Sequence, residues 1–254
     1  MKTYTIDDIL NHKEFTTSLQ KIKDIEGRIE GRIMSTPNKC IHVIYLLAKL
    51  LGSKLKTYVE LGVLHGGSMS LVKMAMSRKK SAKIIGVDMF DGFDLRFHID
   101  PVSKVEITNQ VVSRNLHYFG KDNVDIRLVK GDAAAKKTVE AVENQLEGEK
   151  ISLLFIDCDF KKENVITMFK EYGKLVSSGG IIVFGNYRRK EYPGVERAIE
   201  ELSFRGWKTV GVYKMYYIVQ KKGIQGRPAG RKTARSLYEK IERENEKKKN
   251  KAKK

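Results

Sequence analysis

The feature that most constrains this chain is a series of short apolar runs separated by stretches with helical periodicity. The runs contain five or six residues and are rich in β-branched side chains; they occupy 57–61, 83–87, 124–129, 151–156 and 180–184. Continuous runs of this length are typical of strands buried on both faces of a parallel sheet. Helical patterns follow them at 68–78, 104–119, 134–147, 162–174 and 194–204. This alternation predicts a doubly wound α/β sheet.

The end of the pattern is different. Two strand-like runs, 207–213 and 215–220, are separated by only a tight turn. A parallel crossover needs about a dozen residues or more, so this pair must be antiparallel. The expected fold class is therefore α/β, with a doubly wound, seven-stranded, mostly parallel sheet that ends in a C-terminal antiparallel hairpin.

Charge divides the chain into parts. The formal net charge is +18, and residues 221–254 alone carry 14 basic and 4 acidic side chains with few apolar ones. Such a segment cannot bury enough surface to fold alone. We expect an N-terminal helical cap over 1–54, a ligand-binding sheet domain over 55–220, and a basic tail over 221–254 that is disordered or helical. The tail is either an arm for nucleic acid or a solubilising extension.

Several classes of protein are excluded by what the sequence lacks. Cys40 and Cys158 are its only cysteines, too few for a disulfide scaffold or a zinc ribbon. It has no secretory signal and no apolar run close to the roughly 20 residues that span a bilayer. We therefore expect a cytoplasmic protein without a membrane span.

A glycine-rich turn follows the first expected strand. Gly62, Gly66 and Gly67 lead directly into a helix, which suits close approach of a ligand to the backbone. Asp88 ends the second strand, where a carboxylate can accept hydrogen bonds from ribose hydroxyls. The Gly-x-Gly-x-x-Gly spacing for pyrophosphate is absent, and Glu60 would repel pyrophosphate but suits an ammonium group. The pattern favours S-adenosylmethionine over NAD or ATP.

These features carry a resemblance that spans about residues 55–220. The matching segments are 59–63 (VELGV), 66–68 (GGS), 87–93 (VDMFDGF), 131–132 (GD), 155–159 (FIDCD), 179–187 (GGIIVFGNY) and 193–195 (PGV). In them the chain resembles the class I S-adenosylmethionine-dependent methyltransferases. More narrowly, it is similar to the macrocin O-methyltransferase-like branch, which methylates hydroxyls of sugars and other small molecules.

The resemblance implies a Rossmann-like methyltransferase fold and a set of cofactor contacts. In this family, residues at these positions surround the methionine part, the ribose, the adenine and the transferred methyl group of S-adenosylmethionine. The implied residues are Glu60, Gly62, His65, Gly66, Gly67, Ser68, Asp88, Met89, Phe90, Asp132, Ala133 and Asp157.

The resemblance also implies a divalent metal, held by carboxylates after strands four and five, that acidifies the acceptor hydroxyl. Asp157 and Asp159 follow strand four, but the expected Asp-Asp-Tyr after strand five is replaced by Gly185, Asn186 and Tyr187. Asp157, Asp159 and Asn186 are therefore the candidate Mg²⁺ ligands. A helix cap is the alternative role for Asp159.

Asp157, Asp159 and His65 are the candidate catalytic residues. A histidine is a natural general base near neutral pH, although a loop histidine that packs on the cofactor is the alternative for His65. The basic run 188–190, just after Asn186, is either a phosphate or carboxylate clamp or a solvated surface.

Three functions remain open at this point. The first is methyl transfer to a hydroxyl of a small molecule or glycan, with Mg²⁺ as a candidate second cofactor. The second is a nucleic-acid methyltransferase that grips phosphates with its basic tail, and the third is a catalytically silent module that binds polyanions. An oligomer is compatible with each of them.

Overall fold

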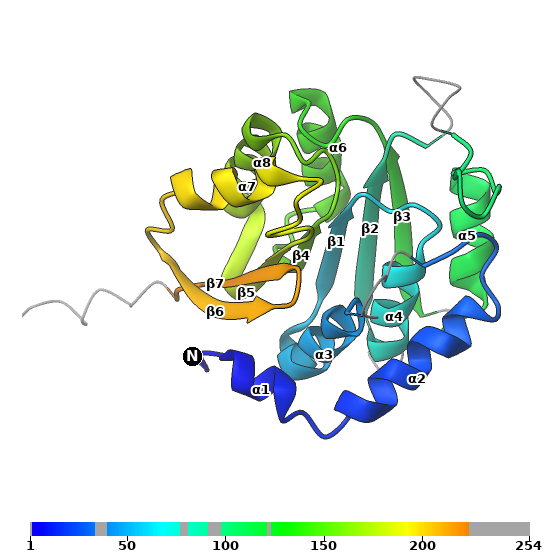
Figure 1. Ribbon diagram of the computed structural model, residues 1–254, viewed down its shortest axis with the longest axis horizontal. Helices are drawn as coiled ribbons and strands as arrows, with labels where there is room; N and C mark the ends of the chain where they lie inside the picture. The colour runs from blue at the N-terminus through cyan, green and yellow to red at the C-terminus, as the bar shows by residue number, and fades with distance from the viewer. Residues whose placement is uncertain (1, 34–39, 77–80, 91–97, 121–122, 224–254) are drawn as a thin grey trace, which may run out of the picture. The chain divides into compact units, whose positions relative to one another are not determined.

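A seven-stranded sheet organises the chain (Figure 1), in the strand order β3-β2-β1-β4-β5-β7-β6. This computed structural model describes residues 2–33, 40–76, 81–90, 98–120 and 123–223. The strands are β1 (Thr57–Leu61), β2 (Ala82–Asp88), β3 (Val124–Lys130), β4 (Ile151–Ile156), β5 (Val176–Phe184), β6 (Trp207–Tyr213) and β7 (Tyr216–Lys221). The first five pair in parallel, and β7 pairs antiparallel with both β5 and β6. The predicted fold class is confirmed.

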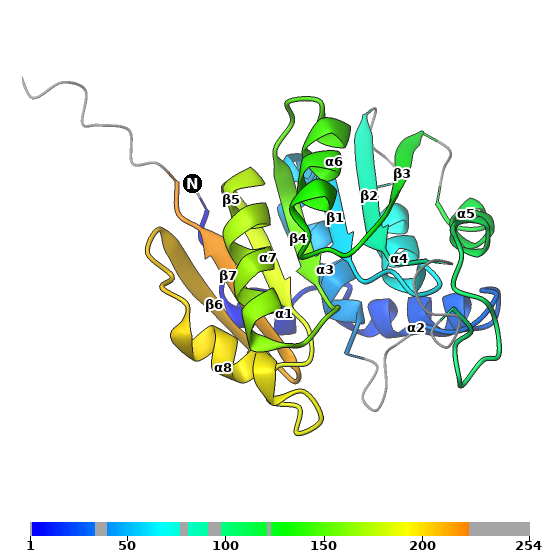
Figure 2. The ribbon, with the colours of Figure 1, turned by 90° about the horizontal axis from the view of Figure 1, so that it is seen from above.

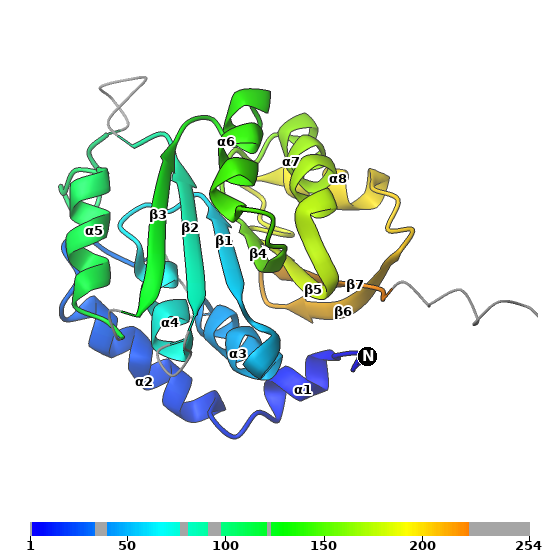
Figure 3. The same cartoon turned by 180° about the vertical axis from the view of Figure 1, so that it is seen from behind.

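Helices cover both faces of the sheet (Figures 2 and 3). They are α1 (Ile6–Leu10), α2 (Phe15–Glu26), α3 (His42–Leu51), α4 (Gly67–Met76), α5 (Asn109–His117), α6 (Lys136–Leu146), α7 (Lys162–Leu175) and α8 (Pro193–Glu201), with a short 3₁₀ turn at Gly52–Lys54. Successive strand residues point to opposite faces. Accordingly Tyr58 and Phe155 belong to the apolar cluster that includes α3 and α4, whereas Val59 and Ile156 belong to the cluster that includes α6 and α7.

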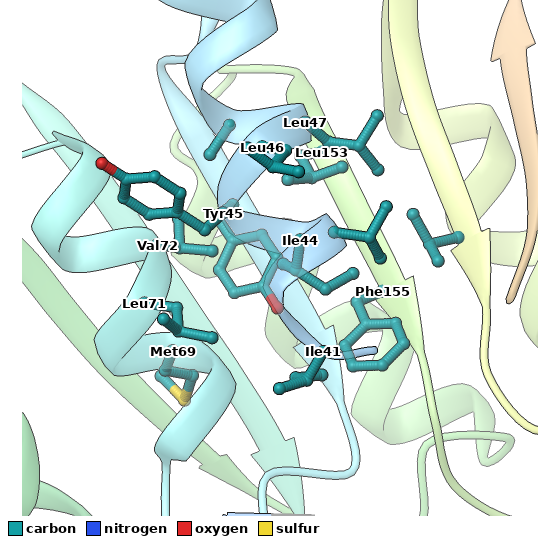
Figure 4. Packing of buried hydrophobic residues seen from close by; sticks show 14 of the residues in the cluster. Ile41, Ile44, Tyr45, Leu46, Leu47, Met69, Leu71, Val72, Leu153 and Phe155 are labelled. Carbon is teal, nitrogen blue, oxygen red and sulfur yellow. The ribbon is translucent and has the colours of Figure 1, made fainter. Parts of the chain in front are cut away.

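Helix α3 joins the N-terminal residues to the sheet. Its sequence, HVIYLLAKLL, is apolar on nearly every face, and a helix of this kind must be buried. Figure 4 shows its side chains packed against Leu71 and Val72 of α4 and against Leu153 and Phe155 of β4. The expected N-terminal cap therefore lies within the same compact unit as the sheet, Met1–Lys221.

Most element boundaries lie within a few residues of the expected ones, and the starts of β5 and α5 differ most. Strand β5 starts at Val176 rather than at 180, because it follows α7 directly and its pairing with β4 shifts between Ile151 and Leu153. Helix α5 starts at Asn109 rather than at 104, because Thr108 caps it and the residues before it form an antiparallel bridge to Ile99. The sequence Thr-Pro-Asn at 36–38 predicts a helix start, and it lies outside the described residues.

The carboxyl ends of the central strands meet at one edge of the sheet. The Gly62 N–H donates to Val87 O (2.9 Å), the Asp157 N–H to Leu61 O (2.8 Å), and the Gly185 N–H to Ile156 O (2.8 Å). These bonds extend the ladder beyond the strands, so the first residues of three loops lie side by side. In the part of the chain that the structure describes, no helix is long and apolar enough to cross a membrane.

Candidate active site

Two adjoining cavities open at this edge of the sheet. The first, which we call the β4 cavity, has a volume of about 240 Å³ and is lined by Arg32, Ile33, Ile41, Glu60, Gly62, Val63, Leu64, Gly67, Ser68, Asp88, Ile107, Asp157, Cys158, Phe160 and Asn186. The second, the β3 cavity, has a volume of about 330 Å³ and is lined by Gly62, Val87, Asp88, Met89, Gly131, Asp132, Ala133, Cys158 and Asp159. They share Gly62, Asp88 and Cys158, so one extended ligand can occupy both.

Asp88 holds the turn that separates the cavities. Its Oδ2 accepts hydrogen bonds from the backbone N–H groups of Val63 (2.7 Å) and Leu64 (3.0 Å), and its Oδ1 accepts from the Met89 N–H (2.7 Å). Gly62, at φ +94°, begins this turn, and a Cβ there would lie 2.6 Å from the carbonyl oxygen of Asp157. Only glycine fits so close to a neighbouring strand end.

Glu60 is a buried carboxyl in the wall of the β4 cavity. It lies on β1 and accepts hydrogen bonds from the hydroxyls of Tyr58 (2.6 Å) and Ser68. Burial raises the pKa of Glu60 to about 8, because little water reaches its charged form. A cationic ligand in this cavity would favour the ionised carboxylate.

Asp157, which directly follows β4, also lines the β4 cavity. The Asn186 Nδ2 donates a hydrogen bond to its Oδ1 (3.0 Å), and desolvation raises the pKa of Asp157 to about 8. A Cβ at Gly185 would lie 2.0 Å from the same Oδ1. The Asp157 carboxyl thus occupies the space that a side chain at 185 would need.

Asp159 is separated from Asp157. It lines the β3 cavity, and its Oδ2 accepts from the Asn164 side-chain amide. Asn186 donates its side-chain N–H to Asp157, so its amide oxygen and the Asp157 carboxylate are not directed at one ion. The three candidate Mg²⁺ ligands therefore do not converge. Nor does any group of three His, Cys, Asp or Glu side chains suited to a metal occur among the described residues. The arrangement does not fit a metal centre.

Three of the implied cofactor residues line neither cavity: His65, Gly66 and Phe90. His65 is fully buried; its Nδ1 accepts from the Arg32 N–H (3.3 Å), and its Nε2 lies 3.4 Å from Val105 O. A ring that accepts at Nδ1 and donates at Nε2 satisfies both contacts. His65 is thus placed to support the turn and away from the cavities, and Phe90 is a core residue.

Other lining residues are absent from the sequence-based set. Arg32, Ile33 and Ile41 come from the N-terminal part of the chain, Ile107 precedes α5, and Phe160 follows β4. Arg32, Ile33, Ile41 and Ile107 do not directly follow a strand, and none of the five belongs to a segment that carries the family resemblance. Arg32 and Ile33 have one signal, a repeat, Gly-Arg-Ile at 27–29 and again at 31–33.

The basic run after Asn186 is at the surface. Arg188 pairs with Glu196 and Arg189 with Glu191, both at 3.1 Å. Neither arginine lines a cavity. The C-terminal tail, for which the sequence leaves open an arm for nucleic acid or a solubilising extension, lies outside the described residues, apart from 221–223.

Comparison with known proteins gives matches along most of the chain. Residues 59–187 match the family described as "Methyltransferase domain". The uncharacterized protein R132 of Acanthamoeba polyphaga mimivirus is 30% identical over 188 residues, which are 72% of this chain and 74% of that protein.

Among solved structures, the fold is similar to the apo structure of CalS11, a TDP-rhamnose 3′-O-methyltransferase of calicheamicin biosynthesis. The TM-score is 0.52 and the identity 14%, over 83% of this chain and 95% of that one. It is also similar to the methyltransferase MycE in complex with Mg and SAH (S-adenosylhomocysteine), with a TM-score of 0.54 and 15% identity over 83% of this chain and 57% of MycE.

Proposed function

This chain belongs to the methyltransferase domain family, and from that premise we propose that it transfers the methyl group of S-adenosylmethionine to a hydroxyl of a small molecule or glycan. One observation supports this most strongly. Two carboxyls with raised pKa, Glu60 and Asp157, line a cavity that shares Gly62, Asp88 and Cys158 with a second cavity, which is lined by Asp132.

The cofactor would extend across both cavities. Met89, Asp132 and Ala133 would receive the adenine in the β3 cavity, and Asp88 the ribose at the junction. Glu60 and Ser68 would receive the methionine part in the β4 cavity. Carboxylates along this path complement the two positive charges of the sulfonium and ammonium groups.

When bound, the cofactor supplies a methyl group activated by the positive sulfur. The Asp157 carboxylate, in the wall of the β4 cavity, would receive the hydroxyl proton of the acceptor as the acceptor oxygen takes up the methyl group, and S-adenosylhomocysteine would be the by-product. A base is most effective when its pKa lies near the working pH, and a pKa of about 8 meets this condition. Asn186, through its bond to Oδ1, would hold the carboxylate in one orientation.

The acceptor would occupy the rest of the β4 cavity, between Asp157 and the apolar side chains of Ile41, Ile107 and Phe160. An apolar wall with a few polar groups suits a small organic acceptor. CalS11 acts on TDP-rhamnose, and MycE is described in complex with mycinamycin VI. Both structural neighbours favour a small-molecule acceptor over nucleic acid. A nucleic-acid acceptor is supported only by the basic sequence of the tail.

Mg²⁺ is present in the MycE complex. In this chain Asp157 and Asp159 face different cavities, and Asn186 donates to Asp157. The proposed transfer therefore uses no metal ion, and Asp157 acts directly on the acceptor.

The experiment is methyl transfer from radiolabelled S-adenosylmethionine to a panel of nucleotide sugars, phenols and glycosides. We expect a labelled ether on one class, and a loss of at least about 100-fold in Asp157→Asn. Asp159→Asn, which alters the carboxyl in the other cavity, should retain proton transfer and so keep kcat near wild type. Label on nucleic acid or on an amine, or undiminished turnover in Asp157→Asn, would overturn the proposal.

A further inference from the structure

The β4 cavity has an uneven distribution of charge. Its lining contains three carboxyls, Glu60, Asp88 and Asp157, whereas Arg32 is the only cation among the described residues that line it. The proposed cofactor carries two positive charges and one negative charge, the carboxylate of its methionine part. A carboxylate among three acidic side chains needs a cationic partner.

Arg32 is held in place by a buried acid. Its Nε and Nη2 donate to Asp100 Oδ2 and Oδ1, both at 2.7 Å, and the Asp100 side chain is 2% exposed. The guanidinium holds the pKa of Asp100 well below its usual range. Asp100 itself does not line the cavity. A bidentate pair of this kind fixes the guanidinium plane, and Arg32 lines the cavity whereas its counter-ion does not.

The position of Arg32 favours the methionine end of the cofactor. Its backbone N–H donates to His65 Nδ1, and the next residue, Ile33, packs so closely on Gly67 at the start of α4 that a Cβ there would lie 2.6 Å from Ile33 Cγ1. Glu60 bonds to Ser68, the next residue of α4. Arg32 does not line the β3 cavity, where the adenine would lie.

We infer that Arg32 is a cofactor-binding residue that pairs with the carboxylate of the methionine part, while Glu60 receives the ammonium group. Asp100 acts through Arg32 as a positioning residue. This inference rests on the proposed function. The competing assignment, an anionic group of the acceptor, is separated from it by the experiment below.

Two ligands that differ in the carboxylate of the methionine part test this pairing. They are SAH and its decarboxylated analogue S-adenosyl-3-thiopropylamine. Calorimetric titration of the full chain should give wild type a clear preference for SAH. In Arg32→Gln, SAH should bind about 10-fold to 100-fold more weakly, the range for a hydrogen bond to a charged group, and the analogue within about 2-fold of wild type. Arg32→Lys, which keeps the charge, should recover part of the preference.

Arg28→Gln is the matched control, because the Gly-Arg-Ile repeat places an equivalent arginine at 28 that does not line the cavity. It should bind both probes as wild type does. If Arg32→Gln weakens both probes equally, Arg32 only supports the cavity wall; if it weakens neither, its partner is on the acceptor. Either result overturns the inference but leaves the proposed function standing. Failure of wild type to bind SAH would reject both.

Discussion

At the scale of single residues, the candidate site depends on the absence of a side chain at residue 185, which leaves space for the Asp157 carboxyl. Residue 185 is glycine, and the Asp157 carboxyl lies where its side chain would be. The next residue, Asn186, donates a hydrogen bond to that carboxyl, whereas an aspartate at 186 would repel it. These two departures from the family pattern therefore form one arrangement around Asp157.

Gly185→Ala tests this arrangement. The new Cβ would meet Asp157 Oδ1 at 2.0 Å, which forces one of them to move. Overpacking of this kind should lower the free energy of unfolding by about 1–3 kcal/mol, measured by chemical denaturation. Gly27→Ala is the control, since its nearest contact would be an ordinary 3.5 Å and its φ is −78°. Equal stability of the two variants would contradict the proposed crowding.

The raised pKa values of Glu60 and Asp157 predict a pH dependence. Both are about 8 in the folded chain, whereas free carboxyls ionise near pH 4, so the folded state holds protons that the unfolded state has lost. The stability of the ligand-free protein should therefore fall as pH rises from about 4 to about 8. Ionisation favours a cationic ligand, so the affinity for S-adenosylmethionine should rise over the same window.

Calorimetry at pH 6, 7 and 8 measures this effect. We expect the dissociation constant for S-adenosylmethionine to fall with each step, by up to about tenfold per unit for each proton released. SAH, whose sulfur is neutral, should show a weaker dependence. Glu60→Gln should bind more weakly and with a smaller slope. An affinity that does not change over this range would show that the two carboxyls are already ionised.

At the scale of elements, the segment 29–33 is held over the site by residues far away in the sequence. The Asn115 side chain of α5 donates to the carbonyls of Glu30 and His65, both at 2.9 Å, and its Oδ1 accepts from the Glu30 N–H at 2.8 Å. In Figure 1 the chain that follows α2 passes close to α5. One buried amide thus joins the N-terminal segment, the glycine turn and α5.

Asn115→Ala should leave three backbone groups of the interior without their partner. We expect a loss of about 2–4 kcal/mol in the free energy of unfolding, and faster hydrogen exchange at the Glu30 amide. The neighbouring Arg114→Gln removes only an exposed ion pair with Glu30 and should cost at most about 1 kcal/mol. Slow exchange at Glu30 in Asn115→Ala would indicate that other contacts hold the segment.

At the scale of the whole molecule, the site lies where the strand order reverses, between β1 and β4. Doubly wound sheets bind ligands at such points, beyond the carboxyl ends of their strands. The strands, and the acids near their ends, could be predicted because each acid comes within three residues after an apolar run. Asp88, Asp132 and Asp157 accordingly line the cavities.

The residues that line the site from outside the strand ends could not be predicted in this way. Arg32 and Ile107 reach the β4 cavity through pairings such as Arg32 with Asp100, which join residues far apart and have no periodicity. The separation of Asp157 from Asp159 depends on loop geometry, since Asp159 adopts φ +39°. Neighbours in sequence therefore face different cavities, and the convergent metal ligands expected from spacing alone are absent from the described site.

The most direct test of the account is a crystal structure of the full chain with SAH. We predict adenine beside Asp132 and Ala133 in the β3 cavity, the amino-acid end between Glu60 and Arg32, and sulfur facing Asp157. SAH bound in the reverse direction, or outside the two cavities, would contradict it. So would crystals grown in saturating SAH in which both cavities hold only water.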